Sequence, residues 1–409
     1  MRQLEAKNVR GIESPIYIGV IFILVTVALN KDWGSVQILW WSIVALFILT
    51  SLFVQFGRFR DVIIDKTYMV WLLCFFGLCA FSILWALSSS LVLTVLKSML
   101  IHSVIFLLLI ASVKSIKDVE ILMGILLSSC LVNAIYLMIQ NIEMLTQSTD
   151  ETIDRLGVEG NWNANEIGMM MSVSILLLLY FFGKTKSGAN KALIILAIGF
   201  LTFVSFLSGS RKAFIVVLMS IMLYVPFKSK GKRVRAVLFA LALAVVAFFL
   251  IMNVPFFYSI IGWRVESFFS LYTGEGQVDG STIYRQKLIA AAFDTWQEYP
   301  LLGCGIDCFR IFGEIATGKD YYAHNNYLEL LADLGVVGFI CYYWGYIYVG
   351  SMLWKYRDKD NISKVLLMIL CILLIISLAF VHYSDFFFGL IIMLMFAYVS
   401  VCKKADKQE

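Results

Sequence analysis

One histidine stands where a polar loop runs into a helical pattern of apolar residues. Asp320, His324, Asn325 and Asn326 form the polar stretch, and the following residues are apolar at helical spacing as far as Gly338. Because an imidazole titrates near neutrality, a histidine at this position is a candidate proton acceptor. The alternative interpretation is a histidine that caps the helix or lies at an interface.

Two cations occupy the start of another apolar helical pattern. Arg211 and Lys212 directly follow the short turn Ser208-Gly209-Ser210. Cations are unfavourable beside the free N–H groups of a helix N-terminus, unless an anion binds there. The alternative is that both side chains extend to lipid headgroups.

A third candidate cation, Arg285, lies in the segment 281–300, which has an amphipathic helical pattern. It falls one turn before an apolar stripe formed by Leu288, Ile289, Ala292, Phe293 and Trp296. A guanidinium on that face points into the protein or the membrane and needs a partner there. Pro300 is expected to end this helix.

A fourth cation, Arg155, stands almost alone in the acidic loop 142–162. Asn161, Asn163 and Asn165 follow at the start of the next apolar pattern. Asparagines at this position cap a helix, and they also offer amide donors to a sugar or a phosphate.

These side chains belong to a chain built mainly from apolar helices. It has 409 residues, of which 61% are hydrophobic and 15% charged, whereas soluble globular proteins carry about 25% charged residues. Runs of about 18 apolar residues or more can cross a hydrocarbon core of about 30 Å. We therefore predict an all-α polytopic membrane protein with spans near 15–31, 35–56, 67–87, 91–113, 119–141, 163–182, 191–209, 212–227, 235–256, 323–354, 363–382 and 384–402, about twelve in all.

The basic residues predict the orientation of these spans. Lys and Arg gather before the first span and in every second loop after it, which places both termini in the cytoplasm. The net charge of +5 therefore indicates topology and not affinity for nucleic acid. The first run lacks a small-residue cleavage site and is expected to be an uncleaved anchor. The predicted organisation is nine spans in 1–256, an extracytoplasmic loop with an amphipathic helix in 257–322, and three spans with a cytoplasmic tail in 323–409.

Other polar positions carry weaker signals. Most cysteines lie in spans and are expected to pack as small residues. Cys304 and Cys308 lie in the outer loop, where they either form a disulfide in an oxidising compartment or remain free thiols. No spacing indicates a metal site, and the Asp-x-Asp motif at 358–360 is typical of a solvated cytoplasmic loop. Lys97 and His102, inside the fourth span, are candidates for the rim of a cavity.

Taken in order, these motifs resemble the O-antigen ligase and Wzy-type polysaccharide polymerase superfamily. The resemblance covers residues from 155 to roughly 356 and rests on the order, spacing and shared outer side of three motifs. They are Ser208-Gly209-Ser210-Arg211-Lys212-Ala213, then Arg285 with Trp296 and the segment Pro300-Leu301-Leu302-Gly303-Cys304-Gly305, and last the stretch from His324 to Gly335. The family often has Asn-Pro-Asn where this chain reads Asn163-Ala164-Asn165.

The resemblance implies an all-helical, GT-C-like glycosyltransferase in the cytoplasmic membrane of a bacterium. The family transfers a glycan from undecaprenyl diphosphate to an acceptor hydroxyl, with inversion and without a metal or another cofactor. The implied partners are the lipid-linked donor, a glycan acceptor, the bilayer and other polysaccharide assembly proteins, with no nucleic acid.

The resemblance also assigns roles to the candidate residues. Arg211 and Arg285 would clamp the leaving diphosphate, because the forked donors of arginine match phosphate oxygens. His324 would take the proton from the attacking hydroxyl. Further substrate contacts are expected from Arg155, Lys212, Asn165, Asn326, Tyr321, Tyr322 and Trp162. The aromatic residues and asparagines of this set are more typical of interfacial anchors and helix caps than of sugar contacts.

Several functions remain open at this point. A polymerase extends another lipid-linked repeat unit, and we favour it over a ligase because nothing in the outer loop indicates a dedicated acceptor-binding module. A transporter of the same lipid would be expected to show repeated halves and charged or broken helices near the midplane. A peptidoglycan-type polymerase would place a decisive carboxylate in the large loop, where Glu266, Glu275 and Asp279 are available.

Overall fold

The computed structural model describes residues 12, 14–56, 62–143, 156, 162–228, 233–267 and 280–408. The structure is 83% helical, and no strand occurs among these residues. Its elements are α1 (Pro15–Leu29), α2 (Lys31–Ser35), α3 (Gln37–Gln55), α4 (Lys66–Phe81), η2 (Ser82–Leu84), α5 (Ser89–Ser112), α6 (Ile116–Gln140), α7 (Ala164–Lys184), α8 (Gly188–Leu207), α9 (Arg211–Lys228), α10 (Arg233–Asn253), α11 (Pro255–Phe257), η4 (Tyr258–Gly262), α13 (Gly280–Glu298), α14 (Phe309–Thr317), α15 (Asn326–Tyr356), α16 (Asn361–Ile376) and α17 (Phe386–Asp406).

Within this described part of the chain, eight helices are long and apolar enough to cross a membrane. They are α3, α4 with its extension to Leu84, α5, α6, α7, α8, α15 and α17. A pair bent by 92°, Val245–Asn253 with Pro255–Ser267, is a broken span or a re-entrant loop, and α1 and α16 are shorter apolar helices. The chain is therefore an all-α polytopic membrane protein. Each of the twelve predicted segments coincides with a helix, but twelve membrane crossings stay a prediction.

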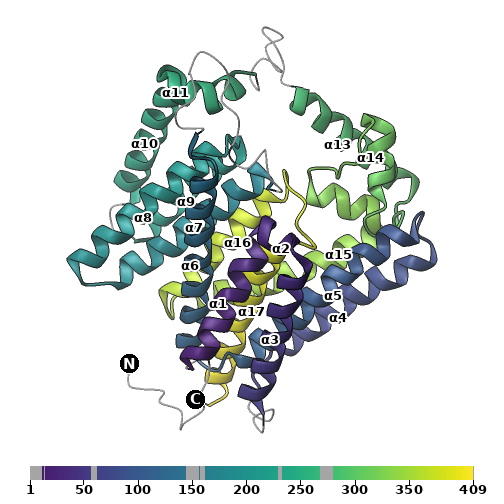
Figure 1. Cartoon of the computed structure of the whole chain (residues 1–409), viewed down its shortest axis with the longest axis horizontal. Helices are drawn as coiled ribbons and strands as arrows, with labels where there is room; N and C mark the ends of the chain where they lie inside the picture. The colour runs from purple at the N-terminus through teal and green to yellow at the C-terminus, as the bar shows by residue number, and fades with distance from the viewer. Residues whose placement is uncertain are drawn as a thin grey trace.

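One helix forms the centre of the bundle. α17 is the most enclosed of these spans, with 89% of its apolar window buried, whereas α3 and α8 have 22% buried and face outward. α17 packs against α5, α6 and α15, and α7 packs against α8 and α9. Figure 1 shows this yellow helix surrounded by segments from both halves of the chain.

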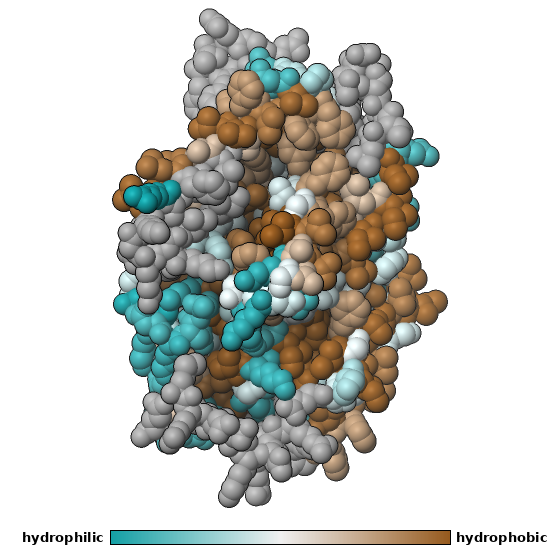
Figure 2. All heavy atoms as spheres, turned by 90° about the vertical axis from the view of Figure 1, so that its left-hand side faces the viewer, coloured by the Kyte–Doolittle hydropathy of each residue, from teal (hydrophilic) through white to brown (hydrophobic). Residues whose placement is uncertain are grey.

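The surface is also that of a membrane protein. Figure 2 shows hydrophobic side chains over much of the face that includes α8 and α10, with hydrophilic side chains gathered mainly in its lower half. Exposed Leu193, Leu196, Val245 and Phe249 belong to these two helices. Such a large apolar surface is typical of contact with lipid.

The predicted helix over 281–300 is confirmed as α13, but its apolar stripe is divided. Leu288 and Ala292 are fully buried, whereas Ile289 and Phe293 are 37% and 42% exposed. α13 packs against both α14 and α15, and only the narrower buried strip meets these helices. The apolar stripe of α13 is therefore buried only along the side that carries Leu288 and Ala292.

α15 is broken at Gly335, which has φ 62° and ψ −166°. The turn after Pro300 pairs with this break through backbone hydrogen bonds. The N–H groups of Cys304 and Gly305 donate to the carbonyls of Ala332 (2.9 Å) and Asp333 (2.8 Å). The N–H groups past the break, at 336 and 337, donate to the carbonyls at 300 and 301 at 3.0 and 3.2 Å. The loop thus replaces hydrogen bonds that a continuous helix would make itself.

Cys304 and Cys308 lie beside this turn as separate buried thiols. The Cys308 thiol lies 3.6 Å from the carbonyl oxygen of Ser88. Of the two states considered for this pair, the structure shows free thiols.

Different helix termini lie at the two ends of the bundle. α1 begins and α17 ends at the same end, which is the lower end in Figure 1. α17 begins at the opposite end, and there the starts of α7, α9 and α15 come together through the contacts described next.

Candidate active site

The backbone around His324 is held from both sides. Asn325 caps α15, because its Oδ1 accepts the N–H groups of Tyr327 (3.0 Å) and Leu328 (3.2 Å). The N–H of Ala323 donates to the buried carboxylate of Glu329, one turn into the helix. His324, between them, has a left-handed φ of 56°. Such a conformation costs about 1–3 kcal/mol and persists only where neighbouring contacts impose it.

The imidazole of His324 is neutral at physiological pH. Burial and the positive charges of Lys212 and Arg285 lower its pKa to about 3. Its Nδ1 is buried and has no hydrogen-bond partner. The ring of Tyr322 lies 4.3 Å from the imidazole, and burial raises the pKa of that phenol to about 12. Near neutrality both groups are uncharged, and His324 is the group of this pair with an unprotonated ring nitrogen that is open to a proton.

Arg211 and Lys212 connect the start of α9 to two other segments. The Arg211 guanidinium donates to the carbonyl of Arg264 (2.7 Å) and to Oγ1 of Thr282 in α13 (3.0 Å). The Lys212 ammonium donates to the carbonyl of Ala379, in the segment between α16 and α17. These contacts join the start of α9 to α13 and to the segment before α17, and the charges of Lys212 and Arg285 also act on His324. We call this region the His324 mouth.

The asparagines at the start of α7 belong to the same mouth. Asn163 caps α7 by accepting the N–H of Asn165 (2.9 Å), and its Nδ2 donates to the Tyr322 hydroxyl at 3.2 Å. Asn165 accepts the Ser210 hydroxyl at 3.0 Å. Both asparagines thus orient the turn before Arg211 and the ring beside His324, and the capping interpretation holds for Asn163.

The remaining candidates lie differently. Arg155 lies outside the described residues. Asn326 is fully buried, with its Nδ2 donating to the Tyr343 hydroxyl (2.9 Å) and its Oδ1 accepting the N–H of His382 (2.9 Å). Both ends of this amide are used inside the protein, so the geometry supports a structural role for Asn326. Tyr321 is 37% exposed, and its ring lies 6.3 Å from the His324 ring.

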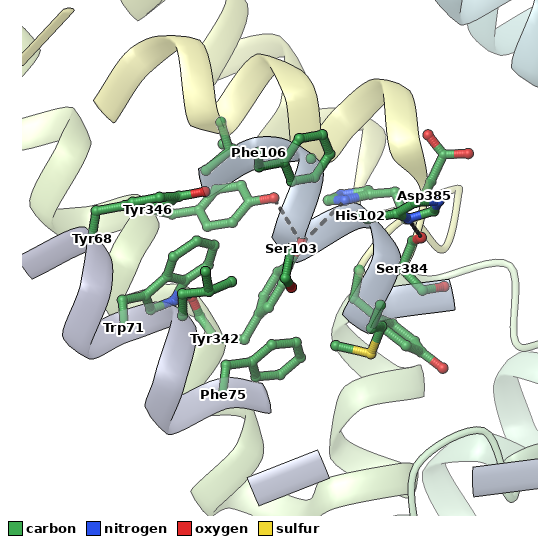
Figure 3. A pocket seen from close by; sticks show the side chains of 16 residues that line it. Tyr68, Trp71, Phe75, His102, Ser103, Phe106, Tyr342, Tyr346, Ser384 and Asp385 are labelled. Carbon is green, nitrogen blue, oxygen red and sulfur yellow. Dashed lines mark hydrogen bonds between the residues drawn. The ribbon is translucent and has the colours of Figure 1, made fainter. Parts of the chain in front are cut away.

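The other two histidines are less suited to proton transfer. His382 is buried, with Nε2 2.7 Å from the Ser377 hydroxyl and Nδ1 3.4 Å from the Tyr342 hydroxyl. His102 Nδ1 lies 3.2 Å from the carbonyl oxygen of Ser384. Both line a cavity of about 60 Å³, which the labelled rings of Trp71, Phe75, Phe106, Tyr342 and Tyr346 surround in Figure 3. His102 therefore lies at a cavity, as predicted, whereas Lys97 is exposed and does not line it.

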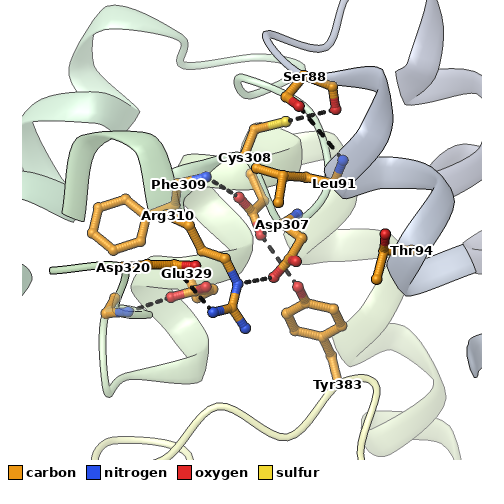
Figure 4. Close-up of polar contacts among 12 residues, drawn as sticks. Ser88, Leu91, Thr94, Asp307, Cys308, Phe309, Arg310, Asp320, Glu329 and Tyr383 are labelled. Carbon is orange, nitrogen blue, oxygen red and sulfur yellow. Dashed lines mark hydrogen bonds and ion pairs between the residues drawn. The ribbon is translucent and has the colours of Figure 1, made fainter. Parts of the chain in front are cut away.

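Figure 4 shows a cluster of carboxylates around Arg310 that the sequence analysis missed. Arg310 pairs with Asp307 (2.8 Å) and Asp320 (3.2 Å). Asp333 of α15 accepts the N–H groups of Asp307 (2.9 Å) and Phe309 (2.8 Å). The available signal was the pair Glu329 and Asp333, because two acids one turn apart on an apolar helix imply buried partners.

A second missed group is an ion cluster at the start of α7. Lys31 pairs with Glu166 at 2.6 Å and lies 3.9 Å from Asp385, the N-cap of α17. These charges join α2, α7 and α17 at the same end as His324. Their signal in the sequence was faint, since each is a single charge at the border of an apolar run.

The middle of the chain, including part of this mouth, is similar to a known family. Residues 192–343 match the family model described as O-antigen ligase. The match covers less than half of the chain, and it makes this part similar to the O-antigen ligase family. The matched domain runs from α8 into α15 and contains Arg211, Lys212, Arg285 and His324. A comparison with curated proteins found no match. The family supports a membrane enzyme that acts on lipid-linked glycans.

Among the described residues, no three His, Cys, Asp or Glu side chains are arranged to hold a metal ion. The charges that act on the imidazole of His324 are those of the cations Lys212 and Arg285. Cations of this kind can bind a diphosphate directly, through charge-assisted hydrogen bonds.

Proposed function

We propose that this O-antigen ligase-family protein polymerises undecaprenyl-diphosphate-linked repeat units of a surface polysaccharide, such as a capsule, O-antigen or exopolysaccharide. The reaction takes place at the outer face of the bacterial cytoplasmic membrane, with both chain termini in the cytoplasm. The observation that carries this proposal is a neutral imidazole held close to Lys212 and Arg285 within the family domain.

The chemistry is an inverting, metal-independent glycosyl transfer. The imidazole of His324 accepts the proton of the acceptor hydroxyl, and the oxygen of that hydroxyl forms a bond to the anomeric carbon of the donor. The bond between that carbon and the diphosphate oxygen breaks, and its electron pair leaves with the diphosphate. Arg211, Lys212 and Arg285, assisted by Arg155, stabilise the negative charge that develops there. Asn165 and Tyr321 remain candidate contacts to the sugars, and Asn326 supports the helix start.

Binding of the donor would also change the pKa of His324. Without a donor, Lys212 and Arg285 disfavour a positive charge on His324 and lower its pKa. A diphosphate bound between these cations would offset their charge, so the imidazole would become more basic when the donor is in place. The base would thus gain strength in the complex in which a proton must be taken.

Glu329 would act as a positioning residue for this base. Its carboxylate accepts the N–H of Ala323 and thereby fixes the peptide next to His324. A base must be held within a narrow range of positions to be effective, and a buried contact on a rigid helix provides that support.

A ligase is the second candidate, because the matched family is described as O-antigen ligase. In that reaction the finished glycan moves to lipid A-core or another acceptor. A transporter for polysaccharide lipids was the alternative of another class, and the family match favours an enzyme over it.

Mass spectrometry of lipid-linked glycans in cells carrying Arg211→Ala tests the proposal. Accumulation of single repeat units supports the polymerase. Accumulation of long chains on undecaprenyl diphosphate indicates the ligase instead. An unchanged glycan profile would remove Arg211 from the mechanism.

A further inference from the structure

A second charged cavity lies at the other end of the bundle, where α4 begins and α17 ends. Its volume is about 410 Å³. The residues that define its charge are Asp65 and Lys66 at the start of α4, and Lys403, Lys404 and Lys407 at the end of α17. Four lysines and one carboxylate thus line a single cavity, at the end of the bundle opposite the His324 loop.

The one carboxylate of this cavity is already engaged. Asp65 receives the Lys403 ammonium (2.8 Å), the Tyr348 hydroxyl (2.7 Å) and the N–H of Thr67 (2.8 Å). The pKa of Asp65 is lowered because these hydrogen bonds and the charge of Lys403 outweigh the effect of burial. Asp65 is therefore a structural anion that holds α4, α15 and α17 together.

The other three lysines of the cavity have no described carboxylate to balance their charge. No described carboxylate forms an ion pair with Lys66, Lys404 or Lys407. Three ammonium groups from two helices converge on a cavity whose single acid is neutralised by Lys403. Like charges gathered in this way repel one another, and an anion bound among them would relieve that repulsion.

The position and the walls of the cavity indicate what kind of anion fits. Lys66 begins one candidate membrane span, and Lys404 lies near the end of another, so the cavity lies at a boundary between lipid and water. Val62, Ile63 and Ile64 form an apolar part of its lining. Basic cavities between membrane helices at this depth suit the phosphate of a lipid headgroup, with apolar surface beside it for the lipid chains.

We propose that this cavity binds the phosphate group of an anionic phospholipid, in the leaflet opposite the His324 mouth. The lysines hold the phosphate oxygens, and the apolar wall contacts the glycerol and the upper acyl chain. The bound lipid bridges α4 and α17, and its binding does not depend on the glycosyl-transfer reaction.

Native mass spectrometry of the full chain in detergent, with phosphatidylglycerol or phosphatidylcholine added, tests this site. We expect retained phosphatidylglycerol at one site, and an affinity lowered roughly tenfold or more in Lys404→Gln/Lys407→Gln, from the loss of two favourable charges. The matched control is Lys186→Gln/Lys191→Gln, which removes the same charge from the turn after α7 and the first turn of α8 and should leave retention unchanged. The thermal midpoint without added lipid shows that each variant is folded.

Three outcomes would overturn the proposal. One is equal retention of phosphatidylcholine and phosphatidylglycerol by the unmodified protein. Another is an equal loss of affinity in both double variants, which would indicate a general surface-charge effect. The third is binding of soluble glycerol phosphate at least as tight as that of the lipid, which would assign the lysines to a water-soluble phosphate.

Discussion

His324 combines three features that rarely occur together at one residue. It has a left-handed backbone, a buried ring nitrogen without a partner, and two cations nearby that lower its pKa. Each of these features is unfavourable for a histidine with a purely structural role. Residues with a strained backbone and a strongly shifted pKa are found more often at functional sites than elsewhere.

The first prediction concerns the base itself. His324→Ala should leave donor binding largely intact, because the cations remain, while turnover falls by about 10²–10⁴-fold with the loss of general-base catalysis. Binding of a lipid-linked donor and its rate of transfer, measured on the same purified protein, test this. Weak donor binding with normal turnover would contradict the assignment.

The second prediction concerns pH. Above about pH 3 the imidazole is neutral in the free protein, so it can act as a base throughout the physiological range. Lys212→Gln removes one of the charges that lower this pKa, so the pKa should rise toward its ordinary value of about 6.5. The acidic limb of kcat/KM should then move to higher pH in the remaining activity. Lys319→Gln, an exposed charge in the same outer segment, should leave the limb in place.

The same shift has a consequence for stability. The unfolded chain binds a proton at His324 below about pH 6.5, whereas the folded chain does not until about pH 3. His324 should therefore lower the free energy of unfolding as the pH falls through this window. If Lys212→Gln does not shift the acidic limb of kcat/KM, the charge of Lys212 does not lower the pKa of His324.

The third prediction separates positioning from catalysis. Glu329→Ala removes the acceptor for the Ala323 N–H, and an unsatisfied buried donor costs about 1–3 kcal/mol. We expect a lower kcat with little change in KM, because the base moves while the cations stay. Glu329→Gln keeps a carbonyl oxygen at this position and should restore most of kcat. If both variants behave alike, the carboxylate has a role other than accepting this hydrogen bond.

At the scale of elements, the break in α15 depends on two interlocked backbones. A Cβ on Gly335 would lie 2.2 Å from the backbone of Leu301, and a Cβ on Gly303 would lie 2.2 Å from the backbone of Asp333. The turn and the broken helix can approach this closely only without side chains at both positions. This contact fixes the outer loop, and with it α13 and α14, against the helix that begins beside His324.

The fourth prediction tests that contact. Gly335→Ala should lower the free energy of unfolding by about 3 kcal/mol or more, since backbone strain and overpacking each cost about 1–3 kcal/mol. Gly318→Ala is the matched control, because Gly318 also has a positive φ (73°) but has open space around it. Thermal unfolding in detergent should show a clearly larger loss for Gly335→Ala. Equal losses would mean that φ alone, and not the contact with Leu301, makes glycine necessary.

At the scale of the whole molecule, the two proposed sites lie at opposite ends of one bundle. The His324 mouth lies at the end where α17 begins, and the lysine cavity lies where it ends. The basic loops predict that the second end faces the cytoplasm. The proposed transfer then takes place on the opposite side, where the lipid-linked donor would be presented.

The fifth prediction addresses this orientation. Lys319→Cys and Lys407→Cys place single thiols at the two ends, in a background without the exposed Cys74 and Cys371. A membrane-impermeant thiol reagent should label position 319 in intact cells and position 407 only after permeabilisation. The reverse pattern would invert the orientation and place the proposed reaction in the cytoplasm.

The sequence by itself determined the helical class, the positions of the long helices and the motifs of the candidate site. Hydrophobic length and helical period are local properties, so α13 and the helix within each predicted span could be located without tertiary information. The motifs around Arg211, Arg285 and His324 were recognisable for the same reason, because each is contiguous in the chain.

Only the tertiary structure decided which of these residues face one another. The pairing of Arg211 with Thr282, the burial of both ends of the Asn326 amide, and the carboxylates around Arg310 all join residues that are distant in sequence or on different elements. The break at Gly335 depends in the same way on the turn after Pro300, which lies before α14 and α15 in the chain. A single sequence shows the local pattern of each partner, but the free energy of these contacts arises only when packing removes both partners from water.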